Sequence, residues 1–157
     1  MKLFVIAVPL IYSLDQATKF WIKNILSEGE SLPLIKNIFH LTLVYNQGTA
    51  FGVLKAYSTF LLFLSGLASL GLIILLTLKH KHMSFLERAG FSFILAGTLG
   101  NFTDRLYYGY VVDFLDFRVW PVFNIADSFI TTGAILLVTA VIRREFSSKK
   151  NYVSNII

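Results

Sequence analysis

The hydrophobic pattern of this 157-residue chain consists of long apolar runs separated by short polar segments. Four runs have about the twenty residues that a helix needs to cross the hydrocarbon core of a bilayer. They cover residues 3–22, 57–78, 85–103 and 124–142. The first run lacks the small-residue cleavage pattern of a secretory leader, so we expect it to be retained. The pattern predicts one domain, residues 1–157, with four transmembrane helices.

Two of the intervening segments have the composition of β-strands. Residues 31–51 are rich in β-branched and aromatic residues and follow a glycine- and proline-containing break, which predicts short strands ending in a tight turn. Residues 111–117 form a second strand-like run between the third and fourth apolar runs. Side chains alternate along an extended strand, so Asp113 and Asp116 should point to opposite faces. The predicted fold class is therefore an all-α membrane protein with a small β region between its first two helices.

Composition agrees with the apolar pattern. Hydrophobic residues make up 55% of the chain and charged residues 15%, with a mean hydropathy of +0.68. Soluble domains carry about 25% charged residues. The net charge of +5 could suggest nucleic acid, but the basic residues gather at the ends of the apolar runs. Basic residues in that position orient membrane helices, so we expect no nucleic-acid partner.

The distribution of Lys and Arg predicts the orientation of the helices. Four spans place both termini on one side, and that side holds eight basic residues: Lys2, Lys79, Lys81, Arg88, Arg143, Arg144, Lys149 and Lys150. The other side holds five in longer loops: Lys23, Lys36, Lys55, Arg105 and Arg118. Basic residues are enriched in cytoplasmic loops. We therefore expect cytoplasmic termini and an extracytoplasmic β region.

Residues 97–128 concentrate the chemistry of the chain. They carry four of its nine acidic residues, Asp104, Asp113, Asp116 and Asp127, and two copies of an Asn-x-x-Asp pattern, at 101–104 and 124–127. Carboxylates at a membrane boundary are costly and usually have a partner or a function. By the topology above, this stretch lies at the outer surface of the membrane.

Structural explanations compete with functional ones for several of these residues. Asn124 followed by Asp127 resembles a helix-capping box. Asp104 and Arg105 could form an interfacial charge pair, and Asn46 and Gly48 are common in turns. Asp15 and Lys19 are four residues apart on one helix face, so they can neutralise one another or shape a polar pocket.

Elimination narrows the possible reactions. The chain has no cysteine and three histidines, two of which fall on the cytoplasmic side, so a Ser-His or Cys-His nucleophile is poorly supported. No metal-binding spacing or nucleotide-binding glycine loop is present. Two adjacent carboxylates can share a proton, one acting as base on water and the other donating to a carbonyl. This is the chemistry of aspartic peptidases, and it needs no cofactor. The helix dipole favours Asp127 as the charged partner. Our hypothesis is that Asp113 is then the protonated one.

Five motifs, in chain order, resemble those of the lipoprotein signal peptidases, or signal peptidase II family. They resemble DQxTK, NxGAAF, GNxxDR, VVDF and FNxADS and lie at Asp15–Lys19, Asn46–Phe51, Gly100–Arg105, Val111–Phe114 and Phe123–Ser128. Each motif is weak alone, but five in order across a four-span chain are specific.

This resemblance implies an aspartic endopeptidase of the bacterial inner membrane. Such an enzyme removes the signal peptide from prolipoproteins, cutting before the cysteine that carries a diacylglyceryl group. The residues that match the catalytic pair are Asp113 and Asp127. The residues that match supporting or substrate-binding positions are Asp15, Lys19, Asn46, Gly48, Asn101, Asp104, Arg105 and Asn124. The resemblance also implies a β-cradle on the outer side and membrane lipid as a neighbour, and we expect a monomer without a metal or cofactor.

Two other classes of protein remain open. A small transporter or proton-relay protein could use Asp15, Asp104, Asp113 and Asp127, although transporters are often built from internal repeats, which are not evident here. A scaffold subunit with ion-paired helix ends is the second. A divalent-cation site formed by the aspartates is a weaker third possibility.

Overall fold

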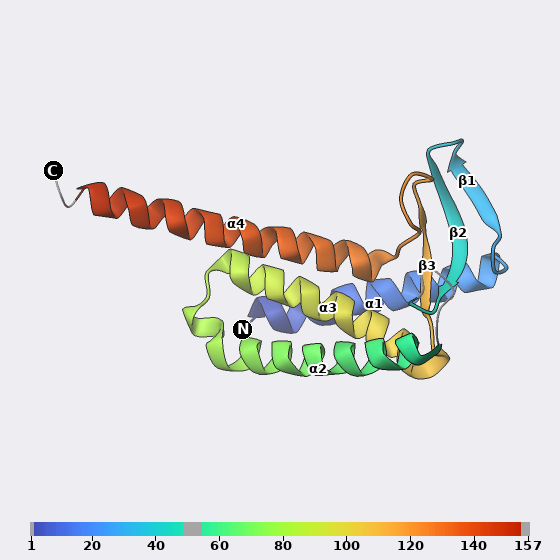
Figure 1. Ribbon diagram of the computed structural model, residues 1–157, viewed down its shortest axis with the longest axis horizontal. Helices are drawn as coiled ribbons and strands as arrows, with labels where there is room; N and C mark the ends of the chain where they lie inside the picture. Colours follow the sequence, from blue (N-terminus) through green and yellow to red (C-terminus); the bar gives the residue numbers. More distant parts are fainter. Residues whose placement is uncertain (1, 49–54, 155–157) are drawn as a thin grey trace.

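The computed structural model describes residues 2–48 and 55–154. Four long helices account for most of them: α1 (Lys2–Ile25), α2 (Lys55–Lys79), α3 (Phe85–Tyr108) and α4 (Ile125–Ser154). A short 3-10 helix, η1 (His80–His82), connects α2 to α3. Three strands complete the fold: β1 (Ser31–Ile35), β2 (Phe39–Asn46) and β3 (Val111–Asp116). The protein is thus mostly helical with one small sheet (Figure 1).

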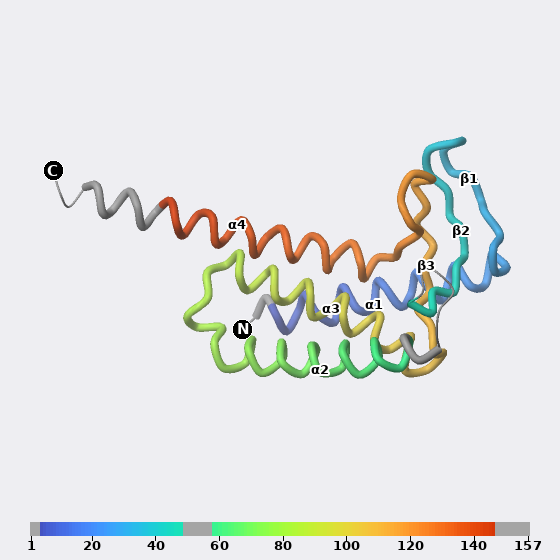
Figure 2. Tube along the Cα trace, viewed as in Figure 1, coloured from blue at the N-terminus to red at the C-terminus, as the bar shows by residue number. Residues whose placement is uncertain are grey.

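The helices lie side by side and the sheet lies across one end of the bundle (Figures 1 and 2). Helix α3 packs against each of the other three. Its ends follow from local sequence: Ser84 and Glu87 form a capping box at the start, and Gly109 ends the helix in the left-handed conformation with φ 77°. Glycine adopts that conformation without steric cost. The point where α3 stops therefore fixes where β3 can begin.

The sheet is antiparallel in the order β1-β2-β3. The strand region predicted between the first two helices is present as β1 and β2, but the third strand comes from the connection between α3 and α4. The predicted cradle is thus incomplete without β3, which pairs Asp113 with Val44 and Val111 with Asn46. The end of the predicted turn, residues 49–51, lies outside the described residues.

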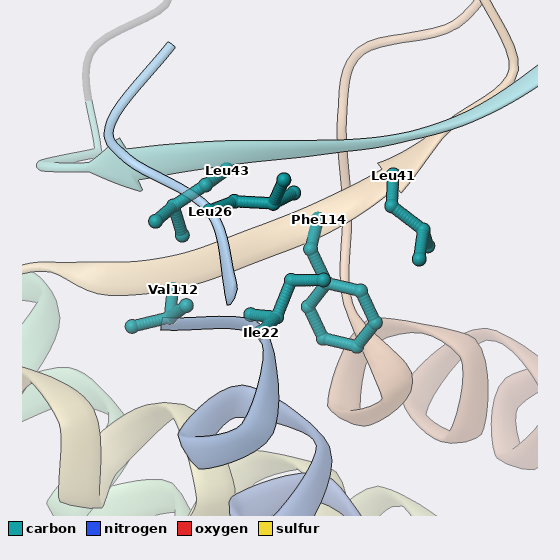
Figure 3. Close-up of a cluster of buried hydrophobic side chains, with 6 residues drawn as sticks. All are labelled: Ile22, Leu26, Leu41, Leu43, Val112 and Phe114. Carbon is teal, nitrogen blue, oxygen red and sulfur yellow. The ribbon is translucent and has the colours of Figure 1, made fainter. Parts of the chain in front are cut away.

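A compact apolar core attaches the sheet to the bundle. Ile22 and Leu26 at the end of α1 pack beneath β2 and β3, against Leu41, Leu43, Val112 and Phe114 (Figure 3). All six side chains are buried. Burial of this area excludes water from the contact and stabilises the position of the sheet on the helices. The strands are therefore held in register above the ends of α1 and α3.

Glycines bring α3 and α4 into close contact. A Cβ atom added at Gly90 would lie 2.8 Å from the carbonyl oxygen of Gly133, and one at Gly133 would lie 2.6 Å from that of Gly90. Nearer the sheet, a Cβ at Gly97 would overlap the carbonyl oxygen of Ala126. Small residues permit this approach of backbones in membrane helices.

Within the described residues, two helical segments are long and apolar enough to cross a membrane: Ser58–His82 and Ile125–Phe146. Helices α1 and α3 have sufficient length but carry charged residues. In α1, Asp15 and Lys19 face inward, while Ile6, Leu10 and Phe20 are more than 60% exposed on its outer surface. An apolar exterior around buried charges is the arrangement that a lipid environment favours.

Ala substitution at two glycines tests the contact between α3 and α4. Gly97→Ala places a methyl group against the backbone of Ala126, so we expect a loss of about 1–3 kcal/mol in the free energy of unfolding. Gly71→Ala is the matched control, because a Cβ there meets no atom within 4 Å. Thermal unfolding in detergent should show a lower Tm for Gly97→Ala and an unchanged or higher Tm for Gly71→Ala. Equal shifts would contradict the packing described.

Candidate active site

A buried ion cluster joins α1 to α3 just below the sheet. The ammonium group of Lys19 lies 2.8 Å from a carboxylate oxygen of Asp15 and 2.8 Å from one of Asp104. All three side chains are at most 2% exposed. The predicted neutralisation of Asp15 by Lys19 is confirmed. Asp104 pairs with Lys19, so the Asp104–Arg105 charge pair considered from sequence does not describe this arrangement.

The oxygens of the two acids also bind the backbone of other elements. Asp15 Oδ1 accepts a hydrogen bond from the backbone N–H of Ala126, in the first turn of α4, at 2.9 Å. Asp104 Oδ2 accepts one from Val112 in β3 at 3.1 Å. Gln16, which sequence reasoning did not select, donates to Asp104 at 3.0 Å and to Asp15 at 3.2 Å. The motif around Asp15 contained Gln16, but no spacing argument distinguished it from a surface residue.

Two asparagine side chains connect this cluster to the two aspartates of interest. Asn101 Oδ1 accepts from Lys19 at 3.0 Å, and its amide nitrogen donates to Asp127 Oδ1 at 2.8 Å. The amide nitrogen of Asn124 donates to Asp113 Oδ1 at 2.7 Å and to Asn101 Oδ1 at 3.1 Å. Asp113 and Asp127 are therefore held by neighbouring amides that also bind one another.

The orientation of each amide is set by a partner that can only donate. Lys19 fixes the oxygen of Asn101, and the backbone N–H of Asp127 fixes that of Asn124 at 2.9 Å. A third amide, Asn46, accepts from the backbone N–H of Gly48 at 2.8 Å and donates to Asp113 Oδ2 at 2.8 Å. All three amide groups therefore present N–H donors to the aspartates.

The turn at Gly48 favours glycine because its φ is 86°, in the left-handed region. A side chain at this position would strain the backbone, and its Cβ would displace the end of the Leu61 side chain. The turn chemistry expected of Asn46 and Gly48 is present, and the same turn directs the Asn46 amide to Asp113.

Asp113 and Asp127 have different environments. Asp113 is 2% exposed on β3, and burial raises the pKa of its carboxyl to about 7, against the lowering effect of the Asn46 hydrogen bond. The nearby Asp127 carboxylate raises that pKa further. Asp127 lies partly exposed in the first turn of α4 and accepts from the backbone N–H of Asn124 at 3.3 Å. The capping box proposed from sequence is thus present, and Asp127 also binds Asn101.

A cavity of about 530 Å³ opens beside Asp113. Its lining includes residues of β2, the following turn and the segment before α4: Val44, Asn46, Gly48, Pro121 and Val122. A second cavity, of about 260 Å³, is lined by Arg105, Tyr108 and Gln47. Gln47 borders both cavities, so the two are neighbours. The second cavity is also lined by residues of α2, so Arg105 lies on the side of the site next to α2.

Asp116 does not join this arrangement. Its carboxylate accepts from Thr42 at 2.7 Å and pairs with Arg118 at 3.0 Å. Strand β3 thus directs Asp113 to Asn46 and Asn124, and Asp116 to a different set of partners, in accord with the alternation expected from sequence. Among the residues that the structure describes, no group of three or more potential metal ligands occurs.

Comparisons with known proteins agree on the class of this protein. Two solved structures described as a bacterial membrane enzyme match it with a TM-score of 0.82 and 30% sequence identity. The first match covers 91% of this chain and 89% of the chain in the solved structure. The chain therefore shares its fold with known bacterial membrane enzymes.

Sequence relatives identify the family. Residues 6–143 match the family described as signal peptidase (SPase) II. The lipoprotein signal peptidase of Nostoc punctiforme is 44% identical over 88% of this chain and 89% of its own length. That of Clostridioides difficile is 38% identical over 94% of this chain and 99% of its own length. The chain belongs to the signal peptidase II family, and the resemblance inferred from its motifs is confirmed.

Replacing Lys19 tests the buried ion cluster. Lys19→Met leaves two carboxylates without their cation, so we expect a loss of about 3–5 kcal/mol in the free energy of unfolding. Lys23→Met on the same helix is the matched control. Lys23 lies over the ring of Tyr108 at 3.9 Å, a cation–π contact of about 0.5–1 kcal/mol. Thermal unfolding of both variants in detergent provides the comparison. A Lys19→Met protein as stable as Lys23→Met would show that the cluster does not hold the fold together.

Proposed function

We propose that this protein is an aspartic endopeptidase that removes the signal peptide from diacylglyceryl-modified prolipoproteins. The observation that carries the proposal is the pair of carboxylates, Asp113 and Asp127, held by two mutually bonded asparagines. Asp113 also lines an open cavity. Membership of the signal peptidase II family supports the substrate class, and the arrangement of the two carboxylates supports the aspartic mechanism.

The two aspartates have complementary roles in this proposal. Asp127, placed at the positive end of the α4 dipole, is the carboxylate that removes a proton from water. Asp113, whose carboxyl pKa is raised to about 7, is the acid that donates a proton to the scissile carbonyl oxygen. Water attack gives a tetrahedral intermediate with two hydroxyl groups. As the C–N bond breaks, Asp127 delivers the proton taken from water to the leaving amine, and one hydroxyl of the intermediate returns its proton to Asp113. The asparagine donors hold both carboxyl groups in position before substrate arrives, which lowers the reorganisation cost of the reaction.

The supporting residues have separate functions. The carboxyl groups are oriented by three asparagines, Asn46, Asn101 and Asn124. Lys19 holds the side-chain oxygen of Asn101, and Asp15 and Asp104 hold Lys19 in place. Gly48 permits the turn that carries Asn46. Arg105 borders the second cavity, next to that of Asp113, and we assign it to substrate binding on the α2 side.

The placement of the site suits a lipid-anchored substrate. We propose that all four helices cross the membrane, with the termini in the cytoplasm and the sheet on the outer surface. Two observations support this arrangement: the apolar segments Ser58–His82 and Ile125–Phe146, and the burial of the charged residues Asp15, Lys19 and Asp104. A diacylglyceryl group in the outer leaflet would hold the adjacent peptide bond at the level of the sheet. One chain supplies every residue of the site, so a monomer suffices.

The transporter alternative receives less support. A proton relay requires titratable groups distributed across the membrane, whereas Asp15, Asp104, Asp113 and Asp127 all join one network at the sheet end of the bundle. The buried acids also have partners that fix them in place.

Asparagine substitutions test the catalytic pair. Asp113→Asn and Asp127→Asn each remove a proton-transfer group, so we expect cleavage of a diacylglyceryl-modified prolipoprotein to fall by about 10²–10⁴-fold or more. Glu28→Gln, which replaces an exposed carboxylate, is the control. The measurement is the initial rate with purified protein in lipid, with and without a chelator, together with the Tm of each variant.

The outcomes separate the peptidase from the scaffold. Normal folding with lost turnover, insensitive to chelator, supports the peptidase. Near-normal turnover in either aspartate variant would refute this catalytic pair. A loss of activity that follows a loss of folding in both variants would instead favour the scaffold interpretation.

A further inference from the structure

The loop between β3 and α4 exposes apolar side chains at its tip. Val119 is 92% exposed and Trp120 is 69% exposed. Trp120 lies five residues before Ile125, where the apolar helix α4 begins. In Figure 1 this loop, drawn in orange, lies on the helix side of the sheet, beside the start of α4. Neither side chain takes part in the carboxylate network.

The base of the loop is built by specific contacts. Arg118 adopts a left-handed backbone with φ 66°, and its backbone N–H donates to Asp116 Oδ1 at 2.8 Å. The Phe117 ring lies against Phe39, with centroids 4.8 Å apart, and against Phe123, at 5.9 Å. A left-handed conformation at a non-glycine residue persists only where its surroundings hold it. These contacts therefore fix the direction in which Val119 and Trp120 project.

The same contacts remove charge from the loop. Arg118 is its cation, and the guanidinium group lies 3.0 Å from Asp116 Oδ2, which also accepts from Thr42. Burial opposes ionisation of Asp116, but the hydrogen bonds from Thr42 and Arg118 outweigh it and lower the pKa of the carboxyl. The pair is therefore neutral overall at physiological pH, and the tip beyond it carries apolar side chains alone.

We propose that Val119 and Trp120 insert into the outer interfacial layer of the bilayer, so that the loop anchors the sheet to lipid. Lipid is the partner that the observations favour, because the exposed tip is uncharged and apolar and lies five residues before the apolar helix α4, and because tryptophan prefers the membrane–water interface. This inference rests on the proposal that α4 crosses the membrane.

Anchoring at this point has a consequence for the site. Pro121 and Val122 follow the tip directly and line the cavity that contains Asp113. A loop seated in lipid would therefore place the mouth of that cavity at the level where a lipid-anchored peptide enters.

Site-specific probes in the full chain test the proposal. The chain has no cysteine, so single cysteines can carry an environment-sensitive fluorophore. Val119→Cys reports the loop tip, Ile135→Cys reports the exposed face of α4, and Glu28→Cys reports the exposed segment after α1. In vesicles, we expect lipid-borne quencher to reduce the Val119 and Ile135 signals several-fold more than iodide does. The reverse should hold at Glu28.

A second readout avoids the label. The two tryptophans are Trp21 and Trp120, so Trp21→Phe leaves Trp120 as the sole indole. Brominated lipid should quench its emission.

The labelled cysteines give distinct outcomes. A label at Val119→Cys that iodide quenches, with a label at Ile135→Cys that lipid quenches, would overturn the anchor while leaving the membrane placement intact. Iodide-accessible Ile135 would overturn both, and Val119 shielded from both quenchers would show that protein, not lipid, covers the tip.

Discussion

A single buried ammonium group is the interaction on which the fold and the site depend. Lys19 would be very costly to bury alone, and it is stable because Asp15 and Asp104 surround it. Each acid then uses a further oxygen or lone pair to bind a backbone N–H, at Ala126 in α4 and at Val112 in β3. One polar cluster therefore connects α1, α3, α4 and the sheet.

The cluster also sets the electrostatics of the site. Because Lys19 can only donate, it turns the oxygen of Asn101 inward and its amide nitrogen toward Asp127. The first turn of α4 does the same for Asn124, which presents its amide to Asp113. The same contacts therefore hold the motif residues in the fold and orient the carboxylates. Asn124 and Asp127 cap helix α4, and Asn124 also holds the carboxyl group of Asp113.

Much of this arrangement could be predicted from the sequence, because it depends on local patterns. The long apolar runs predicted the positions of all four helices. The alternation of side chains along a strand predicted that Asp113 and Asp116 point to opposite faces. The pairing of β3 with β2 could not be predicted, because it brings together segments about 67 residues apart, as in the Asn46–Asp113 hydrogen bond. Gln16 was missed for a similar reason: its partners Gly100 and Asp104 lie on α3, and no periodicity identifies them.

The helices show a second limit of sequence reasoning. Apolar length identifies α2 and α4 directly, whereas α1 and α3 carry charges that hydropathy counts against a membrane span. Asp104 is neutralised only in the folded bundle, where it pairs with Lys19 of another helix. Their cost in lipid is therefore a property of the tertiary structure.

The pH dependence of turnover tests most directly the claim that Asp113 and Asp127 hold opposite protonation states. If protonated Asp113 is the acid, kcat/KM should fall as the pH rises through about 7, the value to which burial raises its pKa. Asn46→Leu removes a hydrogen bond that stabilises the charged form of Asp113, so it should raise that pKa and move the alkaline limb to higher pH. A rate that increases through pH 7, or a limb that Asn46→Leu leaves in place or moves to lower pH, would contradict the assignment.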